Sequence, residues 1–210
     1  FITDVLQLID QANLTLTNEG LAIYLSILHG KKKINLGEVS LQNSGWKDND
    51  PLARGNLPIL TEVLRQSSAS RDDEGNGGVT QANWSPRLHF VWSILLPVIC
   101  QESQDDGSVG HVSKKRKKTK EIIKFPEFWQ MAVDESFFNE KSSSERKYLG
   151  FLIFEKTIRL VPSGWVPHIF SRNLMRTLIN QTADSKRMLH KISQKTLNSI
   201  VNAGEADDGV

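Results

Sequence analysis

The sequence has only one cysteine, Cys100, among its 210 residues. An intramolecular disulfide is therefore excluded, and no cysteines and histidines have the spacing of zinc ligands. These absences argue against disulfide scaffolds and zinc fingers and favour a reducing compartment. Apolar runs are short, the longest lying near 94–99 and 149–154, whereas a membrane-spanning helix needs about 18 residues. The sequence predicts a globular protein that does not span a membrane.

Motifs of catalysis are missing as well. The chain has no phosphate-binding loop, no dinucleotide-binding glycine motif, no HExxH and no GxSxG. Three pairs of aspartates lie in polar loops: Asp48/Asp50, Asp72/Asp73 and Asp105/Asp106. Because none of them has a partner carboxylate on a rigid element, we interpret them as solvated loop residues and not as cation ligands. Asp134 and Glu135 would point about 100° apart on a helix, so they do not form a general acid–base pair. We expect no enzyme activity, no cofactor and no metal site.

Residues that could react or stack on bases are interpreted mainly as packing residues. Cys100 has no basic neighbour in sequence that would activate its thiol, and His89 lies beside core residues. Four tryptophans stand among Leu and Ile at helical spacing: Trp84, Trp92, Trp129 and Trp165. We therefore predict that they lie in the core. Trp46, in a polar loop, either anchors that loop or faces a partner.

Apolar residues recur at helical spacing, and period-two alternation is absent, so the fold class is predicted to be all-α. The expected helices cover about 2–12, 18–30, 57–66, 86–99, 126–137, 143–160, 168–182 and 185–203. Caps are predicted at Thr17, at Ser85, at Ser142 with Glu145, and at Asp184. Gly30 is expected to end the second helix in a left-handed conformation, and Pro97 to kink or end the fourth.

The eight helices form roughly antiparallel pairs with a spacing near forty residues, which predicts a HEAT/armadillo-like α-solenoid with long polar insertions. A compact irregular helical domain is the alternative. We expect one continuous solenoid in three parts: helical repeats over 1–101, a low-complexity basic insertion over 102–124, and further helical repeats over 125–210. The insertions after the second and fourth helices would project from one edge, and that after the third from the other.

Positive charge is concentrated although the formal net charge is only +2. A basic block has the composition of a nuclear localisation signal or a phosphate-binding arm and consists of Lys114, Lys115, Arg116, Lys117, Lys118 and Lys120. Residues four apart on the last two predicted helices could form a basic ridge, made of Arg172 and Arg176 with Arg187, Lys191 and Lys195. Solvated polar surface is the competing interpretation of both features.

Two segments resemble a known family. These are RLHFVWSILLPVI at 87–99 and FWQMAVDESFFNEKSSSERKYLGFLIFEKTI at 128–158. They are similar to the Myb-binding protein 1A / DNA polymerase phi family, and the chain looks like a nucleolar, fungal-type member. The resemblance is densest over about 85–158. Because the chain starts at Phe1 without an initiator Met or a signal segment, we expect an internal part of a longer protein.

The resemblance implies a long α-solenoid in the nucleus and nucleolus that acts in ribosomal RNA synthesis and ribosome biogenesis. The implied partners are ribosomal DNA or pre-ribosomal RNA, pre-ribosomal assembly factors, transcription factors and an import receptor. We therefore expect a non-enzymatic scaffold. One alternative is a co-regulator module that binds transcription factors, with the basic block serving import only. The other is the polymerase activity that the family name suggests, although the Asp-Thr-Asp motif of family B polymerases is absent from this sequence.

Overall fold

The described part of the chain is built from helices. The computed structural model describes residues 2–30, 44–66, 87–102 and 121–207. The longer helices are α1 (Ile2–Gln11), α2 (Asn18–Leu28), α3 (Leu57–Gln66), α4 (Val91–Glu102), α7 (Ser144–Thr157), α9 (Arg172–Thr182) and α10 (His190–Asp207). Shorter elements are η2 (Lys47–Asn49), η3 (Arg54–Asn56), α5 (Phe125–Phe128), α6 (Glu135–Phe137), η7 (Ser163–Trp165) and α8 (Val166–Ile169). The all-α prediction is confirmed.

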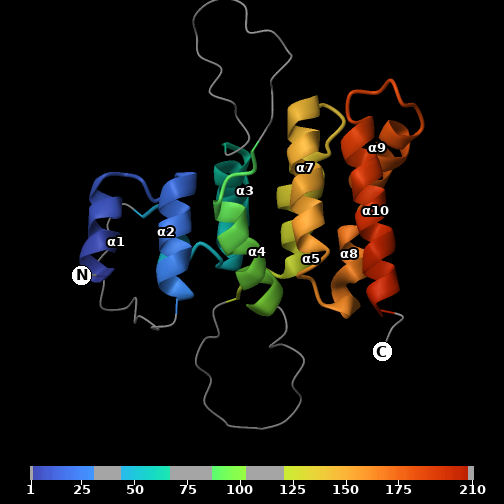
Figure 1. Cartoon of the computed structure of the whole chain (residues 1–210). Coiled ribbons are helices and arrows are strands. Elements are labelled where there is room, and N and C mark those ends of the chain that lie inside the picture. Colours follow the sequence, from blue (N-terminus) through green and yellow to red (C-terminus); the bar gives the residue numbers. More distant parts are fainter. Residues whose placement is uncertain (1, 31–43, 67–86, 103–120, 208–210) are drawn as a thin grey trace, which may run out of the picture.

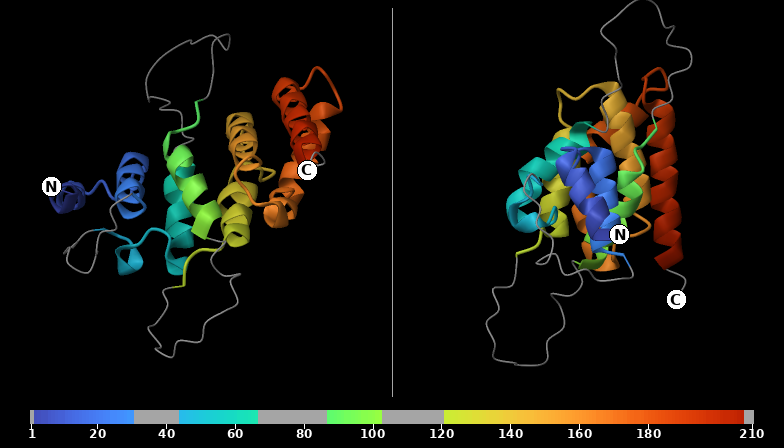
Figure 2. Two further views of the ribbon diagram at one scale, coloured as in Figure 1. Left: turned by 60° about the horizontal axis from the view of Figure 1, so that its bottom comes forward. Right: turned by 90° about the vertical axis from the view of Figure 1, so that its left-hand side faces the viewer.

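The helices stand side by side in chain order, from α1 at one end of a row to α10 at the other (Figure 1). The left-hand view of Figure 2, turned about the horizontal axis, keeps this order. Neighbours pack on one another: α2 contacts α1, α3 and α4, whereas α10 contacts α7 and α9. In the described ranges, no helix is both long and apolar enough to cross a membrane.

One hydrophobic cluster extends from Leu21 in α2 to Ile192 in α10. Aromatic side chains fill its centre, where Trp92 and Trp129 are almost completely buried. The ring centroids of Trp129 and Phe154 lie 6.3 Å apart, and the two rings meet edge to face, an arrangement that aromatic pairs prefer. The core prediction is confirmed for both tryptophans. Trp165 is half-buried, and Trp84 lies outside the described residues.

The first helices follow the prediction closely. Thr17 caps α2, its hydroxyl oxygen accepting the amide hydrogen of Gly20 at 3.1 Å, and α3 has the predicted bounds. Trp46 anchors its loop, because its buried indole donates to the carbonyl oxygen of Thr15 at 3.1 Å. Gly30 does not adopt the predicted left-handed conformation, and α2 ends at Leu28. Apolar spacing in α1 predicts that Leu8 faces inward, but Leu8 is 64% exposed, because the buried side of the helix is that of Leu6 and Ile9.

Helix α4 begins later and ends later than predicted. It starts at Val91, whose amide hydrogen is accepted by Nδ1 of His89 at 3.2 Å, so His89 closes the turn before the helix. The predicted cap at Ser85 lies outside the described residues. Phe90 therefore precedes the helix and is exposed. Pro97 does not end α4, which continues to Glu102, past the predicted start of the basic insertion at 102.

A π-helical segment, η6 (Trp129–Asp134), joins α5 to α6 within one continuous helix. The wider turn of this segment departs from the regular helical spacing that the sequence predicts, and Met131 is exposed. The predicted cap of the next helix is wrong by one residue: Ser143 accepts the amide hydrogen of Arg146, whereas Ser142 donates to the carbonyl oxygen of Ser136. The predicted helix extends to Leu160, but α7 ends at Thr157 and Leu160 is exposed.

The last two helices are shorter than predicted. A break at Phe170 and Ser171 separates α8 from α9. Helix α10 begins at His190, not at residue 185, because residues 184–189 form turns. Asp184 accepts the amide hydrogen of Lys186 within this turn, and Gln181 accepts that of Leu189, so these backbone groups have partners outside a helix.

Candidate nucleic-acid interface

The predicted basic ridge is only partly assembled. All five side chains are exposed, and α9 packs on α10 as the prediction requires. Arg187, however, lies in the turn before α10, so the expectation that it shares a helical face with Lys191 and Lys195 is wrong. The cause is the late start of α10 at His190.

Two cations of the ridge are held in ion pairs. Arg176 lies 3.3 Å from the carboxylate of Glu140, and the amine of Lys195 lies 2.6 Å from Oε2 of Glu155 on α7. Glu155 is nearly buried, with its side chain 11% exposed, so Lys195 compensates a carboxylate between α7 and α10. Arg172, Arg187 and Lys191 remain as ridge cations with no ion pair to another described residue.

Positive charge is far more widespread in the last third of the chain than the sequence analysis recognised. Residues 141–204 contain eleven lysines and arginines against three carboxylates, Glu145, Glu155 and Asp184. Local runs do not reveal this excess, because the cations are distributed over α7, α9, α10 and the turns between them. A running sum of charge along the sequence would have found it. Cations that were missed include Lys141, Arg146, Lys147, Lys156, Arg159 and Lys186.

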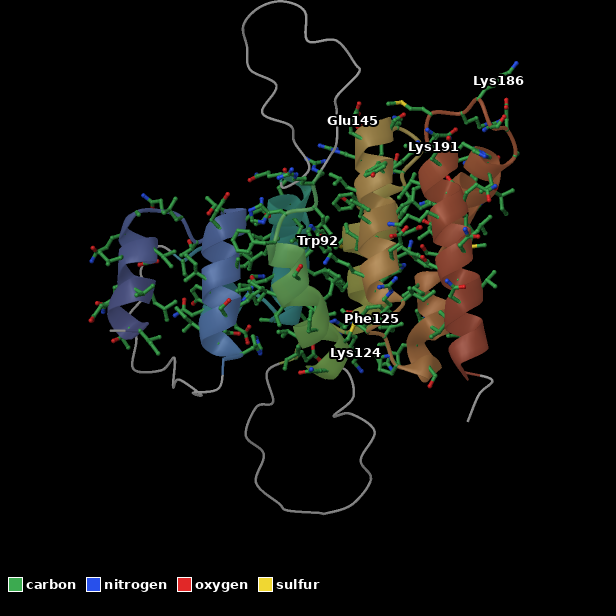
Figure 3. All side chains as sticks on the ribbon, in the orientation of Figure 1. Trp92, Lys124, Phe125, Glu145, Lys186 and Lys191 are labelled. Atoms are coloured by element: carbon green, nitrogen blue, oxygen red, sulfur yellow. The ribbon has the colours of Figure 1, made fainter. Side chains whose placement is uncertain are left out.

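Lys186 and Lys191 lie on the edge of the row where α7 and α10 begin. Figure 3 places Glu145, in the first turn of α7, at the same end as Lys186 and Lys191. Lys124 and Phe125 lie at the opposite end. The basic block at 114–120 lies outside the described residues, and the chain is described again from Glu121, three residues before Lys124.

A buried carboxylate fixes α9 against the rest of the protein. Asp134, on η6, is fully buried and accepts the amide hydrogens of Asn173 at 3.1 Å and Leu174 at 3.0 Å. It also accepts hydrogen bonds from the hydroxyl of Ser171 at 2.5 Å and the side-chain amide of Asn173 at 2.9 Å. Asp134 thus caps α9 from a different helix, where its charge also faces the positive end of the helix dipole.

Other residues weighed as chemical groups have packing roles. Cys100 is buried, and burial raises the pKa of its thiol to about 11, so it is not a nucleophile near neutral pH. His89 has a 20% exposed side chain, and its Nε2 lies 3.5 Å from Glu19. Among the described residues, no three His, Cys, Asp or Glu side chains are grouped so that they could hold a metal ion.

Comparison with known proteins decides the family. The model of the DNA polymerase phi family matches residues 1–210, the whole of the chain. The chain belongs to this family. The predicted resemblance is confirmed, and it extends beyond the segment in which the sequence analysis found it densest.

Two members of the family in fungi are similar to this chain. The rDNA transcriptional regulator POL5 of Saccharomyces cerevisiae is 55% identical over 97% of the chain and 21% of its own length. The rDNA transcriptional regulator pol5 of Schizosaccharomyces pombe is 29% identical over 88% of the chain and 17% of its own length. The chain therefore spans about a fifth of these relatives. No solved structure matches it.

Proposed function

We propose that this chain is part of a nuclear, nucleolar scaffold that acts in the transcription of ribosomal DNA and in ribosome biogenesis by binding, not by catalysis. The observation that carries the proposal is its 55% identity, over 97% of its length, to a protein named as a regulator of rDNA transcription. Both fungal relatives are named as transcriptional regulators and neither as a polymerase.

We further infer that the helical row is a segment of a HEAT/armadillo-like α-solenoid. Support comes from the side-by-side order of the helices in Figure 1 and from packing between sequence neighbours. Stacked helix pairs of this kind form extended surfaces on which a long ligand can lie. Ribosomal DNA, pre-ribosomal RNA and assembly factors fit such a surface better than a small substrate does.

The basic contacts of the scaffold are proposed to come from the block at 114–120 and from the remaining ridge cations Arg172, Arg187 and Lys191. Lysines and arginines in such blocks contact phosphates without reading the base sequence. The same block has the composition that an import receptor recognises. These two roles differ in a measurable way, because only phosphate contacts make the affinity for nucleic acid, and its dependence on salt, change when the block is altered.

The test is binding of the full-length protein to an rDNA duplex and to pre-ribosomal RNA across a salt series, with and without alanine at 114–118. If the block contacts phosphates, log affinity falls steeply with log salt, and the variant reduces the slope by about one unit per lost contact. Binding that is unchanged in the variant would overturn the phosphate role and leave import. Loss of rDNA crosslinking in cells, with import restored by an added signal, would support the proposal, and unchanged crosslinking and rRNA synthesis would contradict it.

A further inference from the structure

Six cations belong to the turns and first helical turns on the edge of the row where α7 and α10 begin. We call them the upper basic end: Lys141, Arg146, Lys147, Lys186, Arg187 and Lys191. Figure 3 places Lys186 and Lys191 at this end, together with Glu145, which directly precedes Arg146. Because α7 packs on α10, the cations of the two helices lie on neighbouring elements. Lys124, near the point where the described chain resumes at Glu121, lies at the opposite end.

The charge of this surface is largely uncompensated. Lys186, Arg187 and Lys191 are exposed and form no ion pair with any other described residue. Lys147 donates to the backbone carbonyl of Glu140 at 3.2 Å, a contact that leaves its charge unpaired. Three carboxylates are nearby: Glu140 pairs with Arg176, Asp184 accepts a backbone amide hydrogen, and Glu145 lies in the first turn of α7. A net positive potential therefore remains at this end.

Helix orientation adds to that potential. The N-termini of α7, with 14 residues, and of α10, with 18 residues, both lie at this end. Each N-terminus carries a partial positive charge of about half a unit. The surface thus combines mobile side-chain cations with fixed partial charges of the same sign, which is a combination that favours phosphate groups.

Among the described residues, no exposed aromatic side chain lies on the elements that carry the six cations. Aromatic side chains of the described residues are buried or half-buried, apart from Phe90, which lies before α4 and not on the elements that carry the six cations. Proteins that bind single strands use exposed aromatic side chains together with positive charge. Charge without stacking groups indicates recognition of the phosphate backbone of a duplex.

We infer that the upper basic end binds the phosphate backbone of duplex nucleic acid, an inference that rests on the proposed function. Packed helices lie roughly 10 Å apart, and a DNA duplex carries one charge per about 1.7 Å of axis. That figure counts both strands, so over about 10 Å each strand presents about three phosphates, as many as the exposed cations Lys186, Arg187 and Lys191. Duplex DNA and helical RNA present the same chemistry, and they are distinguished in the test.

The test compares two variants of the full-length protein that each lose three exposed cations. The first, K186Q/R187Q/K191Q, alters the upper basic end, and the second, K47Q/K124Q/R159Q, is a control of equal charge outside it. Affinity is measured across a salt series for a DNA duplex, an RNA duplex and a single strand of equal length. Circular dichroism and thermal melting confirm that both variants fold as the unaltered protein does.

The inference predicts that the first variant reduces the salt slope on at least one duplex by about three units, whereas the control leaves it nearly unchanged. A change confined to DNA or to RNA identifies the natural duplex. Equal slopes in the two variants, with binding retained, would overturn the inference together with the phosphate contacts proposed for Arg187 and Lys191, and would leave the proposed role of the block at 114–120 standing. An effect on the single strand alone would also overturn it. Absence of any binding by the unaltered protein would overturn both.

Discussion

A single buried carboxylate connects two neighbouring helix pairs. Asp134 accepts hydrogen bonds from Ser171, Asn173 and Leu174 and thereby holds the first turn of α9 on η6. Replacing it by alanine leaves these buried donors without an acceptor, and each unsatisfied group costs about 1–3 kcal/mol. We expect D134A to lower the free energy of unfolding by about 3–5 kcal/mol, measured by urea denaturation.

Glu135 provides the matched control, because it is adjacent but exposed and bonds only to the side chain of Gln130. E135A should change the free energy of unfolding by less than about 0.5 kcal/mol. Equal effects of D134A and E135A would show that Asp134 does not act as the cap of α9.

The role of single residues was predictable where it depends on local sequence, and much less where it depends on distant contacts. Thr17 was identified as a cap because its partner Gly20 lies three residues away. Asp134 was not identified as a cap, because its partners lie 37 to 40 residues further along the chain and no local sequence pattern predicts these contacts. Trp46 lies between these two cases. Its place in a polar loop predicts either an anchor of that loop or a contact with a partner, but the sequence does not decide between the two roles.

Helix α7 passes very close to the preceding turn at Gly150. A β-carbon there would lie 2.7 Å from Cζ of Phe138 and 3.1 Å from Cβ of Phe137, both in the core. Phe138 is itself held edge to face against Phe151, with ring centroids 5.2 Å apart, so it cannot simply move away. We expect G150A to destabilise the protein by about 1–3 kcal/mol in urea denaturation.

Gly204 in α10 serves as the opposite case, because nothing lies within 4 Å of a β-carbon placed there. Alanine is preferred to glycine inside a helix by about 0.5–1 kcal/mol. G204A should therefore stabilise the protein slightly or leave it unchanged. Stabilisation by both substitutions would mean that helix propensity, and not the approach to Phe138, dominates at Gly150.

Helix existence was predicted better than helix boundaries, for physical reasons visible in α4 and α10. Apolar periodicity marks the buried face of each, and Trp92 of α4 lies in the core as predicted. The starts at Val91 and His190 depend on side chains that bond to the backbone just before the helix, His89 and Gln181. Such competing contacts leave no trace in the apolar pattern, so both starts were predicted five residues too early.

At the scale of the whole molecule, the distribution of charge escaped the sequence analysis although every residue was visible. The basic block at 114–120 is contiguous and was recognised, whereas the excess over 141–204 is spread over three helices and their turns. Folding brings part of that excess to the end where α7 and α10 begin (Figure 3). A run of like charges in the sequence shows only residues that are close together along the chain. Packed helices also bring together charged residues that are forty or more positions apart.

The row also predicts how the molecule loses structure. Helix α1 packs on α2 through a cluster of Leu6 and Tyr24 that is separate from the main core. In proteins whose elements contact mainly their neighbours, a local defect need not spread along the row. Leu6 is fully buried, so L6A should cost about 2–5 kcal/mol within α1 and α2.

Hydrogen exchange of backbone amides, followed by mass spectrometry, measures this directly. In L6A, amides of α1 and α2 should exchange faster, while those of α9 and α10 at the far end keep their protection. The matched variant L178A removes a leucine equally buried on α9 and should produce the reverse pattern. If either substitution instead accelerates exchange evenly from α1 to α10, the helices unfold as one cooperative unit, and the proposed assembly from semi-independent helix pairs is wrong.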